Sequence, residues 1–268
     1  MKKILVPIDF TELSDQVLEQ AALFGRKTDA TLVLLHVSDK ANDMELLKSR
    51  LAFKAIATKD RFGIKCEGLV RTGSIFRDIQ AEVEENDYDL MVIGTHGIHG
   101  LKQKFLGADI LKIITKIPVP VLVVQSTSSI KSTYDKIVMP VASHNSYENI
   151  LHAVVNVAKL FNAEVHIYSI DRPGFEWPEQ LKKNLEKTKS AFDSNGIKYL
   201  RINEKQTVLS IGFAAQTLKY AQKSGAELIA MMSVSSDEYH YFAQQDKENM
   251  ITNEGGIPVL CASNLIKE

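Results

Sequence analysis

The stretch KKILVPIDF at residues 2–10 recurs in altered form as YDKIVMPVAS at residues 134–143. Each copy is a short apolar run, rich in Ile and Val, that ends in a proline, which is typical of a β-strand followed by a turn. The two prolines, Pro7 and Pro140, lie 133 residues apart in a chain of 268. A repeat of this length indicates two similar domains and not a solenoid of short units.

The repeat continues along the chain. LVLLHVSD (32–39) aligns with VHIYSID (165–171) at the same offset, whereas YDLMVIG (88–94) aligns with AELIAMM (226–232) at an offset of 138. The second copy therefore has about five extra residues, which we place in the turn-rich segment DRPGFEWPEQ (171–180).

A polar, serine-rich segment, QSTSSIKST at 125–133, lies between the two copies and has the composition of a linker. We therefore predict two domains, residues 1–127 and residues 134–268.

In each copy, apolar runs without polar alternation alternate with longer stretches of helical period. Such runs are typical of strands covered on both faces, and regular alternation of strand and helix predicts a mostly parallel sheet with right-handed crossovers. The expected fold class is α/β, with two tandem Rossmann-like domains, each a five-stranded, mostly parallel sheet with helices on both faces. In the first copy the expected strands are 3–9, 31–37, 66–71, 89–93 and 119–124, and the expected helices are 14–27, 41–61, 74–85 and 107–115.

Composition excludes several classes of protein. A formal net charge of -1 gives no electrostatic footprint for nucleic acid or an anionic membrane. No apolar stretch approaches the roughly 20 residues that span a bilayer, and the N-terminus does not have the pattern of a signal peptide. Two cysteines, Cys66 and Cys261, do not make a disulfide framework and suit a reducing compartment. We expect a cytoplasmic protein.

The stretch GTHGIHGLKQKFLGAD (94–109) follows the fourth expected strand and carries the spacing Gly94-x2-Gly97-x9-Gly107. Glycines let the backbone approach a ligand closely, and the start of the next helix presents unpaired N–H groups, so the loop has the parts of an anion cradle. It matches neither a Walker loop nor a dinucleotide fingerprint. The residues alone leave two readings open, a phosphate-binding loop and a glycine-rich turn.

These features resemble the universal stress protein family, and the repeat resembles its tandem members across nearly the whole chain. In ATP-binding members the motif is G-x2-G-x9-G followed by Ser or Thr. The resemblance implies the adenine nucleotide alpha hydrolase-like fold, with Asp9 hydrogen-bonded to adenine, Val37 lining the adenosine pocket and the glycine loop holding the phosphates of ATP or AMP, with or without Mg²⁺. The residues implied to contact the nucleotide are Pro7, Asp9, Val37, Ile93, Gly94, Gly97, Gly107, Ala108 and Asp109.

One position departs from the family pattern. Ala108 replaces the hydroxyl residue after the last glycine, which removes a hydrogen bond worth about 0.5–1.5 kcal/mol, and Asp109 adds a negative charge near the phosphates. Lys102 and Lys104 can offset that charge. The site is therefore expected to bind ATP despite the loss, or to favour AMP, adenosine or no nucleotide.

The second copy has lost the motif. At an offset of 138 the three glycines become Met232, Ser235 and Gln245, and at an offset of 133 Asp9 becomes Ala142. Side chains at these positions keep phosphate away from the backbone. The second domain is expected to be a folded spacer or a dimerisation partner, or else to bind a different ligand or a protein through SSDEYHYF (235–242).

No catalytic constellation stands out, and a metal role for His96 and His99 lacks further ligands nearby in sequence. We therefore expect a stress-response or regulatory protein that binds an adenine nucleotide and at most hydrolyses ATP slowly. The alternative is an interaction protein of the same fold without a nucleotide. The resemblance further implies that the closing segments 119–124 and 257–262 pack together as an intramolecular pseudo-dimer; a homodimer of the whole chain is a further expectation.

Overall fold

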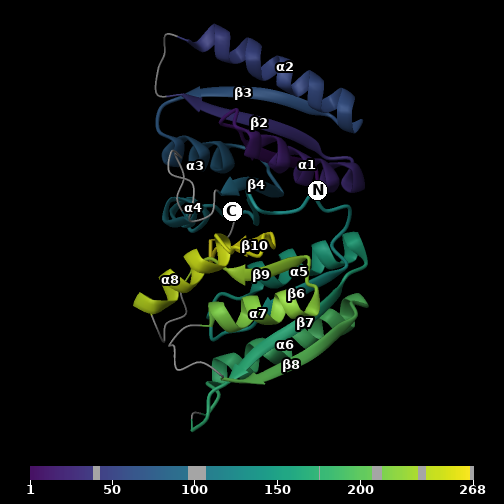
Figure 1. Cartoon of the computed structure of the whole chain (residues 1–268), viewed down its shortest axis with the longest axis vertical. Helices are drawn as coiled ribbons and strands as arrows, with labels where there is room; N and C mark the ends of the chain where they lie inside the picture. The colour runs from purple at the N-terminus through teal and green to yellow at the C-terminus, as the bar shows by residue number, and fades with distance from the viewer. Residues whose placement is uncertain (39–42, 96–106, 175, 207–212, 235–239, 266–268) are drawn as a thin grey trace.

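The computed structural model describes residues 1–38, 43–95, 107–174, 176–206, 213–234 and 240–265 of the chain. It is an α/β structure in which every strand but the closing one of each half is followed by a helix (Figure 1). The N-terminal half contains β1 Lys3–Pro7, α1 Glu12–Thr28, β2 Thr31–Ser38, α2 Met44–Phe62, β3 Cys66–Thr72, α3 Ile75–Glu85, β4 Leu90–Thr95, α4 Gly107–Ile114 and β5 Val121–Gln125. The C-terminal half contains β6 Lys136–Pro140, α5 Glu148–Phe161, β7 Glu164–Asp171, α6 Glu179–Asn195, β8 Tyr199–Lys205, α7 Ala214–Ser224, β9 Leu228–Met232, α8 His240–Ile251 and β10 Val259–Ala262.

The described strands form one ten-stranded sheet in the order β3-β2-β1-β4-β5-β10-β9-β6-β7-β8. Within each half the five strands are parallel, as predicted. The two sheets are joined at their closing strands, where β5 and β10 pair antiparallel with Val123 opposite Val259. Each closing strand thus covers the edge that the other would expose.

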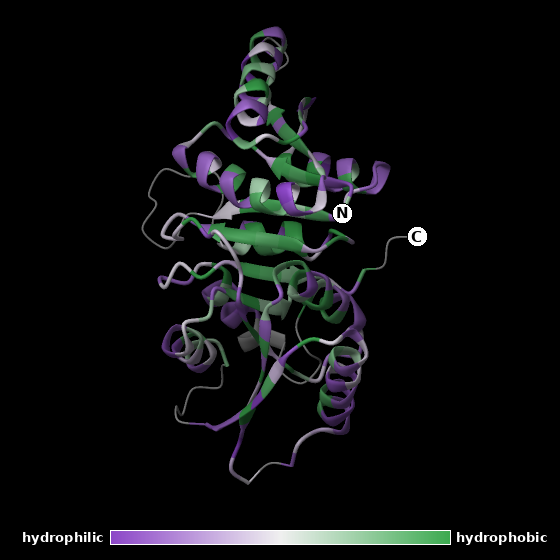
Figure 2. Ribbon diagram, turned by 90° about the vertical axis from the view of Figure 1, so that its right-hand side faces the viewer, coloured by the Kyte–Doolittle hydropathy of each residue, from purple (hydrophilic) through white to green (hydrophobic). Residues whose placement is uncertain are grey.

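Helices cover both faces of this sheet. Strand residues alternate between the faces. Ile4 and Val6 belong to the core on the face that α1, α2, α5 and α6 cover, whereas Leu5 belongs to the core on the face that α3, α4, α7 and α8 cover. Because both faces of the central strands are buried, these strands are largely apolar, and Figure 2 shows the hydrophobic colour concentrated in the middle of the sheet. The edge strands β3 and β8 are partly exposed and carry charged residues. None of the helices in the described ranges is both long enough and apolar enough to span a bilayer.

The two halves also meet through side chains on either side of the central strands. On one face the rings of Phe24, Tyr134 and Phe161 pack edge to face or tilted, with centroids 5.2–5.7 Å apart, and the Tyr134 hydroxyl donates to Gln20 Oε1 at 2.6 Å. At the seam, Gln125 Nε2 donates to the Ile251 carbonyl at 3.0 Å. Gln125, predicted as the first linker residue, is therefore the last residue of β5 and belongs to the packed sheet.

The predicted position of the five extra residues is wrong. The offset between equivalent elements is still 133 at β3 and β8, which begin at Cys66 and Tyr199. It becomes 138 at β4 and β9, which begin at Leu90 and Leu228. Between these points the connection from β8 to α7 is longer than the connection from β3 to α3, so the extra residues follow β8 and not β7. The segment 171–180 misled the prediction because its Pro and Gly residues indicate a turn but not its length.

Candidate functional site

The predicted nucleotide-contacting residues lie on strands that are neighbours in the sheet. Pro7 ends β1 and pairs with Leu35 of β2, and β1 lies between β2 and β4. The chain leaves β1 toward β2 and later returns on the other side to β4, so this is the point where the connections diverge. Ligands of open α/β sheets bind beyond the carboxyl ends of the strands at such a point.

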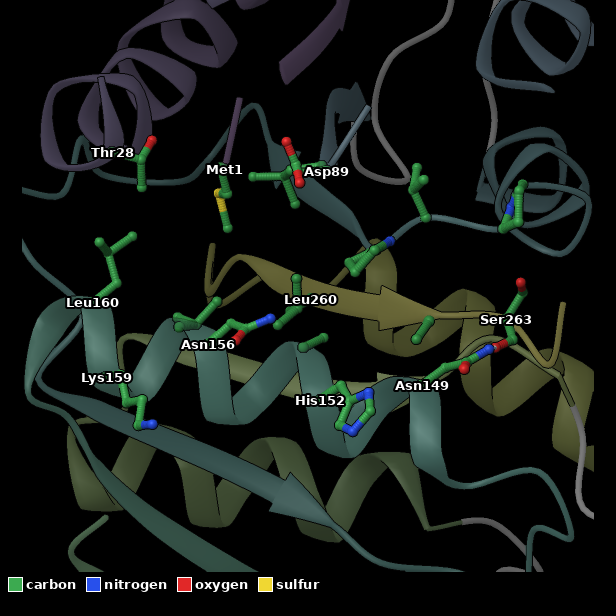
Figure 3. Close-up of a pocket in the computed structure, with 17 residues that line it drawn as sticks. Met1, Thr28, Asp89, Asn149, His152, Asn156, Lys159, Leu160, Leu260 and Ser263 are labelled. Atoms are coloured by element: carbon green, nitrogen blue, oxygen red, sulfur yellow. The ribbon is translucent and has the colours of Figure 1, made fainter. Parts of the chain in front are cut away.

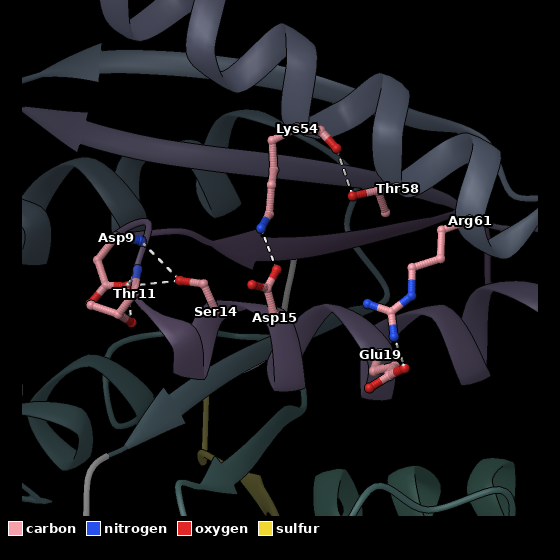
Figure 4. A network of polar contacts seen from close by, with 8 residues as sticks. All are labelled: Asp9, Thr11, Ser14, Asp15, Glu19, Lys54, Thr58 and Arg61. Carbon is pink, nitrogen blue, oxygen red and sulfur yellow. Dashed lines mark hydrogen bonds and ion pairs between the residues drawn. The ribbon is translucent and has the colours of Figure 1, made fainter.

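The Asp9 carboxylate holds the turn between β1 and α1 (Figure 4). Its Oδ1 accepts hydrogen bonds from the Thr11 N–H at 3.0 Å, the Thr11 hydroxyl at 2.6 Å and the Ser14 hydroxyl at 2.7 Å. The Asp9 N–H in turn donates to Ser14 Oγ at 3.3 Å. Asp9 is exposed, and these bonds fix the orientation of its carboxylate at the edge of the sheet. The side chain therefore has a structural role at the start of α1 whatever it binds.

Phe10, next to Asp9, belongs to a cluster that the sequence did not indicate. Its φ of 61° lies in the left-handed region, which is strained for an aromatic residue and is a feature that concentrates at functional sites. The Phe10 ring lies 4.7 Å from the His36 ring, and the Arg50 guanidinium carbon lies 4.1 Å from the Phe10 centroid. His36 Nδ1 is 2.7 Å from the Ile8 carbonyl oxygen. No sequence signal joins these residues, because Arg50 is far from Phe10 along the chain.

Val37 and Ile93 provide an apolar lining on one face of the same edge. Val37 is half-buried near the end of β2, and Ile93 is buried in β4; both pack on the face that α3 and α4 cover. This placement suits the predicted role of Val37 in an apolar pocket, and it gives Ile93 a role in the core as well.

The described glycines of the loop have packing reasons to be glycine. A Cβ at Gly94 would lie 2.7 Å from Leu13 Cδ2 and 2.9 Å from Val17 Cγ2, because α1 crosses β4 at this point. A Cβ at Gly107 would lie 2.6 Å from Thr252 Cγ2, directly after α8 of the other half. Neither glycine has a positive φ. The two glycines therefore permit a helix to approach a strand and one half to approach the other.

The start of α4 carries the remaining predicted residues. Ala108 and Asp109 follow Gly107 in the first helical turn and are half-buried. Lys112 Nζ lies 3.4 Å from Asp109 Oδ1, which partly balances the acidic charge. The N-terminal end of α4 presents N–H groups that favour an anion. Gly97, together with His96, His99, Lys102 and Lys104, lies outside the described residues.

A cavity of about 540 Å³ lies elsewhere, at the seam between the halves (Figure 3). It is lined by the amino ends of β4 and β5, by one side of α5 and by the end of β10, so in the N-terminal half it is at the opposite edge of the sheet from Asp9. Two of its polar side chains have partners: Asn149 Nδ2 donates to the Ser263 carbonyl at 2.8 Å, and Lys159 Nζ donates to Asn195 Oδ1 at 2.7 Å. None of the predicted site residues lines it. In the described ranges, His, Cys, Asp and Glu side chains form no cluster of three or more that could hold a metal ion.

Residues 1–125 match the family model described as the universal stress protein family. Two universal stress proteins, from Synechocystis and Methanocaldococcus jannaschii, are each 27% identical to the chain over 46% and 48% of its length, and each is covered over 97% of its own length. The N-terminal half of the chain, residues 1–125, therefore belongs to the universal stress protein family. The solved universal stress protein from Archaeoglobus fulgidus matches the fold over 97% of this chain and 96% of its own, with a TM-score of 0.74 at 18% identity.

The C-terminal half of the chain differs at the equivalent edge. α8 begins at His240, five residues before Gln245, which is the counterpart of Gly107. Gln245 therefore lies inside a helix, where its N–H is not presented to a ligand. Met232, the counterpart of Gly94, is buried. The described residues at this edge therefore differ between the two halves.

Two basic residues, Lys247 and His144, are buried at this edge of the C-terminal half. Lys247, the counterpart of Asp109, is buried and donates from Nζ to the Met232 carbonyl at 2.6 Å. Burial lowers the pKa of Lys247 to about 8. His144, in the loop before α5, is also buried, and burial together with the Lys247 charge lowers its pKa to about 3. Burial raises the pKa of the Cys261 thiol in β10 to about 12, so this thiol stays protonated and inert.

Proposed function

We propose that the N-terminal half binds one adenine nucleotide at the carboxyl ends of β1, β2 and β4, and that the protein acts as a nucleotide-binding regulatory member of its family. The observation that carries this proposal is the oriented Asp9 carboxylate beside an apolar lining, at the point where the connections of the sheet diverge. An exposed carboxylate in a fixed orientation is suited to accept a hydrogen bond from an adenine amino group.

The side chains at this edge fit the adenosine part of such a ligand better than its phosphates. Val37 provides apolar contact for a ring, and Asp9 provides an acceptor. At the phosphate end, the first turn of α4 offers backbone N–H groups, but Ala108 has no hydroxyl and Asp109 opposes a second negative charge. The proposal therefore covers ATP, AMP and adenosine, with affinity expected to depend weakly on the number of phosphates.

We further propose that the two halves are two domains, residues 1–127 and 134–268, related as an intramolecular pseudo-dimer. The β5–β10 pairing and the packing of Phe24, Tyr134 and Phe161 support this arrangement. In this account the C-terminal domain covers the closing strand of the nucleotide domain and has a structural or interaction role.

The site is tested with Asp9→Asn, which keeps Oδ1 for Thr11 and Ser14 but replaces the second oxygen by a donor. Losing a charged acceptor should weaken adenine nucleotide binding by about 1.5–3 kcal/mol, or about 10- to 150-fold in Kd. Titration calorimetry with ATP, AMP, adenosine and cAMP measures this; cAMP is included because one solved universal stress protein is described in complex with it. The melting temperature should fall only slightly, because Asn keeps the acceptor oxygen for Thr11 and Ser14 but not its charge.

Asp15→Asn is the matched control, because Asp15 is a neighbouring exposed acid whose partner is Lys54 (Figure 4). It should leave nucleotide affinity unchanged. Equal affinities for the wild type and Asp9→Asn would remove Asp9 from the site.

A second candidate function is an interaction protein that binds no nucleotide. The packing contacts at Gly94 and Gly107 favour it, because they explain both glycines without a ligand. No heat of binding for any of the four ligands to the wild-type chain would support this second function and contradict the first.

A further inference from the structure

The outer face of α2 exposes three large apolar side chains. Leu46, Phe53 and Ile56 are 69%, 73% and 59% exposed, although most of the other large apolar side chains in the described ranges are buried. Their spacing of seven and three residues places them in one stripe, on the side of α2 away from the buried Leu51 and Ala55. Figure 1 places α2 at the end of the molecule away from the C-terminal half, so the other half does not cover this stripe.

The fold does not require apolar residues at these positions. α6 is the counterpart of α2 in the C-terminal half: both helices end at a left-handed glycine, Gly63 and Gly196, 133 residues apart. At this offset the counterparts of the apolar stripe are charged; they are Glu179, Glu186 and Lys189. These side chains form ion pairs along α6, with Lys189 Nζ 3.1 Å from Glu186 Oε1 and Lys182 Nζ 2.7 Å from Glu179 Oε1. The apolar face of α2 is therefore specific to the N-terminal half.

Four exposed residues of this face have a self-complementary order. Arg50, Phe53, Ala57 and Asp60 follow one another at spacings of three, four and three residues, and all lie within about 60° of Phe53 around the helix axis. This spacing is unchanged when the helix is reversed. If a second α2 lies antiparallel on the first, Arg50 of each copy therefore meets Asp60 of the other, and the large Phe53 meets the small Ala57. The Ile56 side chains of the two copies then lie next to each other near the twofold axis.

The two charges of this face are available for such a contact. Arg50 and Asp60 are both exposed. Among the described residues Asp60 has no hydrogen bond or ion pair, and Arg50 has no carboxylate partner. The Arg50 guanidinium lies against the Phe10 ring, a contact that leaves the N–H donors at its edge open to a carboxylate.

We propose that the outer face of α2, formed by Arg50, Phe53, Ile56, Ala57 and Asp60, binds the same face of a second copy of the chain across a twofold axis. The symmetric order of base, large apolar residue, small apolar residue and acid is the observation that selects a second copy as the partner. Such an interface is isologous, with each contact made twice.

The dimer should be weak. One pair of crossing helices buries less surface than the about 1,200–2,000 Å² of a standard stable interface. We therefore expect a dissociation constant in about the micromolar to millimolar range. The contact lies on the side of the N-terminal half away from the C-terminal half, so it leaves the β5–β10 seam unchanged.

Sedimentation equilibrium of the full chain, up to about millimolar concentration, tests the proposal. The wild type should dimerise, and the double variant Phe53→Glu, Ile56→Lys should remain monomeric. This pair copies the Glu186–Lys189 pair of α6, so it should keep the melting temperature, which is measured in parallel. Leu200→Glu is the matched control: Leu200 is an exposed apolar residue on the edge strand β8, and its loss should not change the dimer.

Charge reversal identifies the antiparallel register. Asp60→Arg alone should weaken the dimer about tenfold, because two attractive pairs become repulsive. Combining it with Arg50→Asp exchanges the charges and should restore the wild-type dissociation constant. Mixing the two single variants, Asp60→Arg and Arg50→Asp, should likewise restore it, because each chain then supplies the charge that the other lacks.

Three results would overturn the proposal. They are a wild type that stays monomeric, a dimer that survives Phe53→Glu, Ile56→Lys, and a failure of both the charge exchange and the mixture to restore binding. Binding of the monomer to anionic lipid vesicles through the same residues would assign the face to a membrane instead.

Discussion

In the proposed nucleotide site, Ala108 lies where a hydroxyl at the start of α4 would donate to a phosphate. Because the helix N-terminus already favours an anion, Ala108→Ser should add one donor without disturbing α4. We expect ATP to bind about 2- to 10-fold more tightly, equivalent to about 0.5–1.5 kcal/mol, with adenosine affinity unchanged. Calorimetry with the two ligands separates the effects. An equal response of ATP and adenosine, or no response of either, would show that α4 does not contact phosphate.

His144 makes the stability of the C-terminal half depend on pH. Its folded-state pKa of about 3 lies below the unfolded value of 6.5, because burial and the Lys247 charge disfavour the protonated ring. The unfolded chain therefore binds more protons between these values, and stability is lost as the pH falls from 6.5 toward 3. When the pH is lowered from about 7 to about 5, the free energy of unfolding of the wild type should fall by about 2 kcal/mol more than that of His144→Gln. Urea unfolding of both proteins at both pH values measures the difference. Equal losses would mean that the imidazole is solvated in the folded state.

Single residues show where sequence reasoning was limited. The position of Asp9 after a strand could be predicted, and its hydrogen bonds to Thr11 and Ser14 follow a pattern that local sequence carries. The packing reasons for Gly94 and Gly107 could not be predicted, because the side chains that approach them belong to other elements, one of them in the other half. The contact between the Phe10 ring and the guanidinium of Arg50 in α2 could not be predicted for the same reason.

At the scale of elements, α4 and α8 show how the repeated helix was changed. α4 begins at Gly107. α8 begins at His240, so that Gln245, the counterpart of Gly107, lies inside the helix. The alternation of apolar runs with stretches of helical period predicted the five strands and four helices of the N-terminal half to within three residues at each end. The earlier start of α8 and the position of the extra residues could not be predicted, because both depend on loop segments without a periodic signal.

The contact between Gly107 and Thr252 across these helices can be tested by a double-mutant cycle. Gly107→Ala should destabilise the wild type by about 1–3 kcal/mol, because the new Cβ meets Thr252 Cγ2. Thr252→Ser removes that methyl group and keeps the hydroxyl bond to the Glu248 carbonyl. In the Thr252→Ser background, Gly107→Ala should lower the free energy of unfolding by clearly less, as measured by urea unfolding. The same cost in both backgrounds would rule out packing as the reason for the glycine. ATP affinity of the double variant then reports whether phosphate also needs the glycine.

At the scale of the whole molecule, two five-stranded sheets are joined into one through β5 and β10. The repeat in the sequence was sufficient to predict two similar halves and parallel strands, because both follow from local pattern and offset. That the halves share one continuous sheet does not follow from any local pattern; the family resemblance alone implied contact between the closing strands. One half has an oriented carboxylate at the carboxyl edge of its strands, and at the equivalent edge of the other half Met232 and Lys247 are buried.

The difference between the two edges predicts the number of nucleotide sites in the chain. Calorimetric titration of ATP into the full-length protein, after removal of any nucleotide that copurifies, measures it directly. We expect one site for each chain, with Asp9→Asn weakening that site. Two sites for each chain would mean that the C-terminal edge is not closed, and a single site that is unaffected by Asp9→Asn would place the nucleotide elsewhere; either result would contradict the account.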